Sequence, residues 1–298
     1  MANNGIIPIP GPATLPFIGN IADMDKDNSA KTFKRLTKEH GEIFKLDLLR
    51  NRIIGVTTHA LIDEVCDEKR FFKKPNPVLR ELREGIHDGL FTAYLDEPNW
   101  GIAHRVLMPA FGPLSIGGMF GEMHDVASQL VLKWARHGPG HKILLTDDFT
   151  RLALDTLALC SMGFRFNSYY EEKLHPFIDS MGEFLSESGR KSQRPPLPSW
   201  FYRDADQKYQ VNIGVLRQTA EDVLKERVAN PENGRKDLLA AMLKGRDSLT
   251  GEKMSDSSIV DNLITFLQLV GDDLGAAAIA EAGLDGDFLR SAIAEDPH

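Results

Sequence analysis

Cysteine is nearly absent from this sequence of 298 residues, which contains only Cys66 and Cys160. Two cysteines that lie far apart in the chain form neither a disulfide framework nor a zinc motif. We therefore expect a reducing compartment, the cytoplasm, and two free thiols that are both buried.

Long apolar runs and an excess of positive charge are also absent. No uncharged apolar stretch approaches the roughly 18 residues of a membrane span, and the N-terminus lacks the features of a signal peptide. Lys and Arg number 35 against 43 Asp and Glu, which gives a net charge of −8. A surface that follows nucleic-acid phosphates carries the opposite charge, so we expect neither a membrane anchor nor a nucleic-acid partner.

The common glycine-rich nucleotide loops and the His-Glu-x-x-His zinc motif do not occur either. His137 and His141 are four residues apart, but the Gly-Pro-Gly between them prevents a shared helical face. We therefore predict no metal-ligating residues in this chain.

The hydrophobic pattern predicts a mainly helical protein with a small β region near the N-terminus. Residues 5–20 contain four prolines, which favours an extended lead-in. Short β-branched stretches at 42–48 and 52–57 predict an antiparallel hairpin. Apolar residues recur with the helical period in the remaining segments, and a loop or polyproline segment is expected at 191–200. The expected helices cover 29–40, a segment from Met123 to about residue 137, 148–162, a segment around 213–224, and one that begins after the candidate cap Ser255.

The segment 96–111 carries the residues with the most specific chemistry. Pro98 suits the first turn of a helix and Pro109 ends it, so Trp100 and His104 lie on one helical face. An indole N–H and an imidazole side by side could hold an anionic group. Spacing alone leaves open the simpler interpretation that both rings only pack against neighbouring helices.

Trp100-x-x-x-His104-Arg105 followed by Pro109-Ala-Phe111 resembles the third helix of the cytochrome P-450 family of haem-thiolate monooxygenases. Further segments resemble, in chain order, the haem domain of the self-sufficient fatty-acid hydroxylases that are fused to a flavoprotein reductase. These segments are Pro10-Gly-Pro-x-x-Leu-Pro-x-x-Gly-Asn20, Gly41-Glu-Ile-Phe-Lys45, Cys66-Asp-Glu-x-Arg-Phe71, Asp88-Gly-Leu-Phe-Thr92, Leu154-Asp-Thr156, Arg165-Phe-Asn-Ser168 and His175-Pro-Phe177. The resemblance implies a cytochrome P-450 fold for residues 1–267.

This resemblance implies roles for particular residues. Lys73 and Trp100 match positions that reach the haem propionates, and His104 matches the basic position of the third-helix motif. A buried dianionic group needs such cations and donors. Phe91 matches the aromatic residue that leans over the haem and limits substrate approach, although an ordinary core role stays open for it.

The sequence also departs from the family. The fused hydroxylases hold a fatty-acid carboxylate with an Arg and a Tyr on the first hairpin, and Asn51 and Gly55 occupy those positions here. Arg50 or Arg52, which flank Asn51, are the expected substitutes for substrate binding.

The largest departure follows Leu267. The family continues from Leu-Ile-Thr-Phe-Leu into Ala-Gly-x-Glu-Thr-Thr, whereas this chain has no Thr after Thr265, so residues 268–298 form a divergent tail. The family's Cys-ligand loop, which supplies the iron thiolate, is also missing. We therefore expect an incomplete cytochrome P-450 fold that lacks its C-terminal half, contributes no catalytic residue and is inactive as written. With that half missing, the apolar residues of the last helix, Ile259, Leu263, Phe266 and Leu267, are expected to be exposed.

The resulting hypothesis is a fragment of a haem-dependent monooxygenase. Its complete form would hydroxylate fatty acids or similar amphipathic small molecules in the cytoplasm, with dioxygen and electrons from a flavoprotein reductase that uses FAD, FMN and NADPH. The alternative is a non-catalytic truncated helical protein that binds haem, lipid or a partner without turnover. A helical scaffold unrelated to haem is a third interpretation.

Overall fold

The computed structural model describes residues 7–16, 18–25, 29–48, 51–67, 69–137, 140–143, 145–171, 173–192, 194–195, 197–231 and 235–273. The chain divides into two compact units, residues 1–73 and 74–298. Arg50 and residues 274–298 of the expected tail lie outside the described residues.

The first unit is built around the predicted hairpin. Strands β1 (Ile43–Leu48) and β2 (Asn51–Val56) pair antiparallel. The lead-in lies along β1, because Lys45 N–H donates to Pro10 O at 2.8 Å. Helix α1 covers the sheet through Leu36, which is buried together with Phe44 and Leu46. The helical elements of this unit are η1 (Ile21–Asp23), α1 (Ser29–His40) and α2 (His59–Val65).

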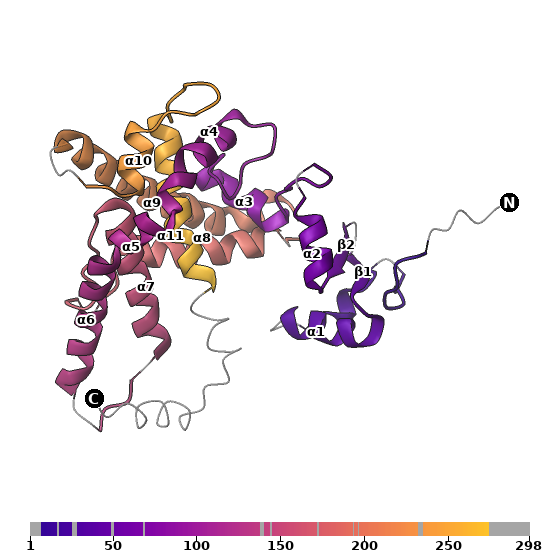
Figure 1. Ribbon diagram of the computed structural model, residues 1–298. Coiled ribbons are helices and arrows are strands. Elements are labelled where there is room, and N and C mark those ends of the chain that lie inside the picture. Colours follow the sequence, from indigo (N-terminus) through magenta and orange to yellow (C-terminus); the bar gives the residue numbers. More distant parts are fainter. Residues whose placement is uncertain are drawn as a thin grey trace, which may run out of the picture. The chain divides into compact units, whose positions relative to one another are not determined.

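The second unit is helical and contains the main hydrophobic core. Its elements are α3 (Pro77–Ile86), α4 (Pro98–Leu107), η2 (Met108–Phe111), α5 (Pro113–Gly118), α6 (Phe120–His137), α7 (Leu145–Met162), α8 (Pro176–Ser192), η3 (Ser199–Tyr202), α9 (Arg203–Ala229), α10 (Leu238–Lys244) and α11 (Asp256–Asp273) (Figure 1). Within the described residues, no helix is both long and apolar enough to cross a membrane.

Helix α11 is the centre of this core, which corrects the expectation of an exposed apolar stripe. Ile259, Leu263, Phe266 and Leu267 are all at most 6% exposed. Helices α3, α7, α8, α9 and α10 contact α11. Because all of these helices precede α11 in the chain, the sequence up to Leu267 already contains the partners that cover it.

Local signals predicted several helix ends correctly. Ser255 caps α11 by accepting a hydrogen bond from Ser258 N–H at 3.2 Å. Gly41, beyond the end of α1, has a φ of 90°, which favours glycine. The expectation of two buried thiols was half wrong, because Cys160 is buried but Cys66 is exposed at the end of α2. The short helix α2 buries none of its residues, and Cys66 at its end is exposed like the helix itself.

We expect Leu263→Ala to lower the free energy of unfolding by about 2–5 kcal/mol, because it leaves a cavity in a fully buried site. Chemical denaturation followed by circular dichroism measures this loss. Leu249→Ala is the matched control, since Leu249 is 76% exposed and its truncation should change stability by less than about 0.5 kcal/mol. Equal effects of the two substitutions would contradict the central position of α11.

Candidate functional site

Trp100 and His104 form a stacked ring pair on α4, as the i, i+4 spacing predicted. Their ring centroids lie 5.0 Å apart, and their planes differ by 18°. Pro98 occupies the first turn of α4, where its missing N–H removes no helical hydrogen bond. Both rings are half-buried, so their N–H groups can meet a ligand that is partly shielded from water.

Arg105, the next residue of α4, is held by a buried carboxylate. Its Nη2 donates to Asp247 Oδ2 at 2.8 Å, and its Nε donates to Oδ1. The Asp247 side chain is fully buried and also accepts from Thr250 Oγ1 at 2.7 Å. A Cβ on Gly101 would lie 2.9 Å from Arg105 Nη1, so glycine lets the guanidinium lie against its own helix. This pair fixes α4, and with it the Trp100–His104 rings.

The start of α4 is fixed by a second carboxylate. Glu97, the residue before the helix, accepts from Arg83 Nη1 of α3 at 2.9 Å and from Tyr94 N–H at 2.7 Å. Arg83 Nη1 also donates to Thr92 O at 2.8 Å. The segment between α3 and α4 is therefore tied to both helices.

Phe91 lies in that segment and is 39% exposed. Its neighbours Thr92 and Ala93 are buried, at 0% and 1% exposure. The Phe91 ring is therefore partly exposed next to two buried residues.

The predicted substrate-anchoring arginines belong to the first unit. Arg52 is exposed and its Nε donates to Asp47 Oδ1 of the facing strand at 2.8 Å. This hydrogen bond holds the pKa of Asp47 below its usual range. Arg52 therefore has an acidic partner that competes with a carboxylate ligand. Lys73, the last residue of the first unit, is exposed.

The structure explains why glycine occupies position 55. It faces Phe44 across the hairpin, and a Cβ at Gly55 would lie 2.5 Å from Phe44 Cζ. The buried Phe44 ring occupies the space that a Tyr side chain at position 55 would need. A larger residue at position 55 would therefore displace Phe44 from the core of the hairpin unit.

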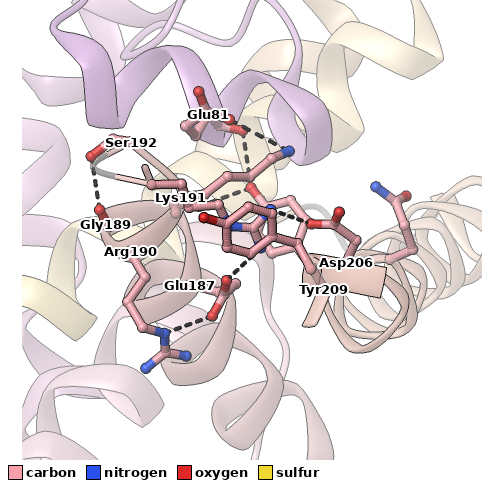
Figure 2. Close-up of polar contacts among 12 residues, drawn as sticks. Glu81, Glu187, Gly189, Arg190, Lys191, Ser192, Asp206 and Tyr209 are labelled. Carbon is pink, nitrogen blue, oxygen red and sulfur yellow. Dashed lines mark hydrogen bonds and ion pairs between the residues drawn. The ribbon is translucent and has the colours of Figure 1, made fainter. Parts of the chain in front are cut away.

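A cluster of charged residues joins α3, α8 and α9 (Figure 2). Lys191 Nζ of α8 lies 3.4 Å from Glu81 Oε2 of α3. Arg194 donates to Glu187 at 2.8 Å and to Asp206 at 2.6 Å, so it connects the end of α8 to α9. The Lys191–Glu81 pair holds α3, from which the Phe91 segment starts, and the Arg194 pairs hold α8 against α9.

Tyr209 lies buried beneath this cluster (Figure 2). Its hydroxyl donates to Glu81 O at 2.9 Å and lies 2.8 Å from Ser188 Oγ. Burial raises the pKa of Tyr209, so the hydroxyl stays protonated and can donate. No local sequence signal predicts this contact, because the two partners of Tyr209 come from α3 and α8, which are separate from its own helix α9.

Two further buried groups, a thiol and an amide oxygen, are relevant to cofactor binding. Burial raises the pKa of the Cys160 thiol to about 11, so this residue stays a thiol at neutral pH. Among the described residues, Gln268 Oε1 of α11 is one of the buried side-chain atoms without a hydrogen-bond partner. An unsatisfied buried acceptor is costly, and a donor from a ligand or from further protein would relieve that cost.

Comparison with known proteins identifies the family. The family model described as "Cytochrome P450", here written P-450, matches residues 9–268. The chain is 56% identical over 262 residues to a bifunctional cytochrome P-450/NADPH–P-450 reductase of Fusarium oxysporum, with 88% of this chain and 24% of that protein covered. It is 47% identical over 265 residues to a self-sufficient cytochrome P-450 monooxygenase of Exserohilum turcicum, with 89% of this chain and 25% of that protein covered.

The chain belongs to the cytochrome P-450 family. Its mainly helical structure with a small two-stranded sheet agrees with the expected fold. The chain spans about a quarter of the length of the relatives it matches. Membership implies haem, and the NADPH–P-450 reductase named in the relatives implies FAD, FMN and NADPH for their complete form.

The described residues fit one end of a haem group. The stacked, half-buried N–H rings of Trp100 and His104 suit propionate carboxylates. Within the described part of the chain, neither cysteine suits the iron, because Cys66 is an exposed residue at the end of α2 and Cys160 is a buried thiol whose S–H donates to Met119 O at 3.9 Å.

The Arg105–Asp247 pair gives a pH-dependent contribution to stability. The hydrogen bonds from Arg105 hold the pKa of Asp247 well below its usual range. A lowered pKa stabilises the folded state above the unfolded value of about 3.9, and this stabilisation is lost as the pH falls through the folded pKa. We therefore expect the stability difference between wild type and Asp247→Asn to be constant above about pH 5 and to shrink below about pH 4.

Urea denaturation from pH 7 to pH 2.5 would measure this difference. Asp63→Asn is the control, because Asp63 lies exposed on α2. A difference between wild type and Asp247→Asn that stays constant down to the lowest pH would contradict the ion pair.

Proposed function

We propose that this chain is the haem-propionate-binding part of a self-sufficient cytochrome P-450 monooxygenase. Residues 1–267 form the N-terminal part of the haem domain, and residues 268–298 depart from it. The family match over residues 9–268 supports this division. The observation that carries the proposal is the stacked Trp100–His104 pair on a helix fixed by the Arg105–Asp247 ion pair.

In this proposal Trp100 and His104 donate hydrogen bonds to propionate oxygens. A propionate role for Lys73 rests on its match to the family's sequence pattern. A pair of carboxylates that is partly removed from water requires such donors. When bound, haem supplies the redox-active iron at which dioxygen is activated. Phe91 restricts which part of a substrate can approach.

The proposed substrates are fatty acids or similar amphipathic molecules, and the electrons come from a reductase fused to the complete protein. The names of the relatives support the reductase. Carboxylate anchoring is assigned to Arg50 or Arg52. Arg52 must release Asp47 to serve in this way, and the exposure of both partners, 65% and 26%, makes such an exchange inexpensive. The free cysteines support a cytoplasmic location.

The chain on its own is assigned haem binding without turnover. Cys160 is a protonated thiol with a raised pKa, and a monooxygenase iron needs a thiolate. The thiolate ligand is therefore assigned to sequence of the complete protein outside this chain. Carbon monoxide added to the reduced, haem-loaded chain should give a spectrum that is not of the thiolate type.

Haem titration followed by Soret absorbance tests the proposal. Trp100→Phe and His104→Leu should each weaken haem binding by about tenfold or more, because each removes a hydrogen bond to a charged group. Trp200→Phe is the matched control, since Trp200 is 62% exposed on η3, and it should leave the affinity unchanged.

The absence of stoichiometric haem binding would contradict the proposal. So would a Trp100→Phe variant whose affinity equals that of Trp200→Phe. Circular dichroism of each variant separates loss of the fold from loss of the site.

A further inference from the structure

The segment that carries Phe91 is attached directly to the central helix. Asn262 of α11 is completely buried, and its Oδ1 accepts from Leu90 N–H at 3.0 Å. Its Nδ2 donates to Ser258 O at 2.7 Å. Because the amide group is bonded at both ends, its oxygen is held toward the residue that precedes Phe91.

The close approach of this segment to α11 depends on Gly89. A Cβ at Gly89 would lie 2.6 Å from Thr265 Oγ1 and 3.3 Å from Asp261 O. Any other residue would push the segment away from the helix. Gly89 also starts the turn around Phe91, since its carbonyl accepts from Thr92 N–H at 3.1 Å and from Ala93 N–H at 2.9 Å.

The residue at the start of the segment is fixed by charge. His87 has a φ of 37°, which is uncommon for a residue with a side chain. Its Nδ1 lies 3.1 Å from Oδ1 of the buried Asp261, which also accepts from Arg217 Nη1 of α9 at 2.6 Å. Thr92 Oγ1 donates to His87 O at 2.9 Å and closes the segment on itself.

We propose that Asn262 is a positioning residue that holds Phe91 in one orientation through its hydrogen bond to the Leu90 backbone. The inference rests on the proposed function, in which Phe91 limits substrate approach. The other contacts fix both ends of the segment, at His87 and at Thr92, whereas the Asn262 bond fixes its middle, next to Phe91. Without that bond the Phe91 ring samples several orientations, and the complete enzyme hydroxylates its substrate at more positions.

The first measurement is amide hydrogen exchange of the wild-type 298-residue chain. Leu90 N–H should exchange at least about a hundredfold more slowly than an unstructured amide, because its acceptor is buried. Exchange at the unstructured rate would overturn the proposal without any substitution.

The second measurement is fluorine NMR of the same chain labelled with 4-fluorophenylalanine. The Phe91 line is identified by its loss in Phe91→Leu. Asn262→Leu keeps the side-chain volume but removes the acceptor, and it should broaden or split the Phe91 line and speed Leu90 exchange about tenfold. Ser161→Ala is the control, because Ser161 of α7 is similarly buried and its hydroxyl donates to Leu157 O of its own helix at 2.6 Å.

Each outcome decides the proposal. A changed Phe91 line in Asn262→Leu with an unchanged line in Ser161→Ala supports it. An unchanged line in Asn262→Leu, or equal changes in both variants, would overturn it. If Asn262→Leu fails to fold, the exchange rate of Leu90 in the wild type still decides.

A separate experiment, in which haem is added to the labelled wild-type chain, tests the proposed function independently of Asn262. Haem bound beside Phe91 should shift the Phe91 fluorine line. The absence of that shift would count against the role of Phe91 in the proposed function. The comparison of Asn262→Leu with Ser161→Ala is made without haem, so its result does not depend on that role.

Discussion

The buried carboxylate of Asp261 constrains the arrangement of the helical unit. A charge at 1% exposure is stable only when cations and donors surround it. Arg217 of α9 and His87 at the end of α3 supply these partners, at 2.6 and 3.1 Å. Helices α3, α9 and α11 therefore meet at Asp261. The apolar side chains of α11 lie in the core that these helices form. The segment that bears Phe91 starts at His87, so the same carboxylate also holds the start of that segment.

A similar principle positions the ring pair on α4. Asp247 is buried and binds Arg105, which places the helix, and the stacked rings of Trp100 and His104 then lie half-buried on it. Glu97 and Arg83 fix the start of the helix in the same way. Among the described residues, the proposed haem-binding donors make no buried ion pair themselves, and their helix is held by pairs that neighbouring residues form. This separation leaves their N–H groups available to a ligand.

The sequence predicted the features that residues close together in the chain determine, which are the helices, their ends and side-chain pairs within one helix. Helical periodicity, Ser255 and Gly41 located α11 and the end of α1, and the i, i+4 spacing placed Trp100 beside His104. Contacts between distant residues had no such signal. Arg105 and Asp247 are 142 residues apart, and Leu90 and Asn262 are 172 apart. The burial of α11 was wrongly predicted for the same reason, because periodicity shows which face is apolar but not which helices cover it. Short motifs that follow one another in the order of the family nevertheless identified the family.

The interaction between Asp261 and Arg217 can be measured directly with a double-mutant cycle, in which Asp261→Leu, Arg217→Met and the double variant are compared by urea denaturation. Each single substitution leaves the other partner without its countercharge. The account predicts that each lowers the free energy of unfolding by about 3 kcal/mol and that the double variant loses clearly less than the sum. Strictly additive losses would contradict the claim that this buried ion pair joins α9 to α11.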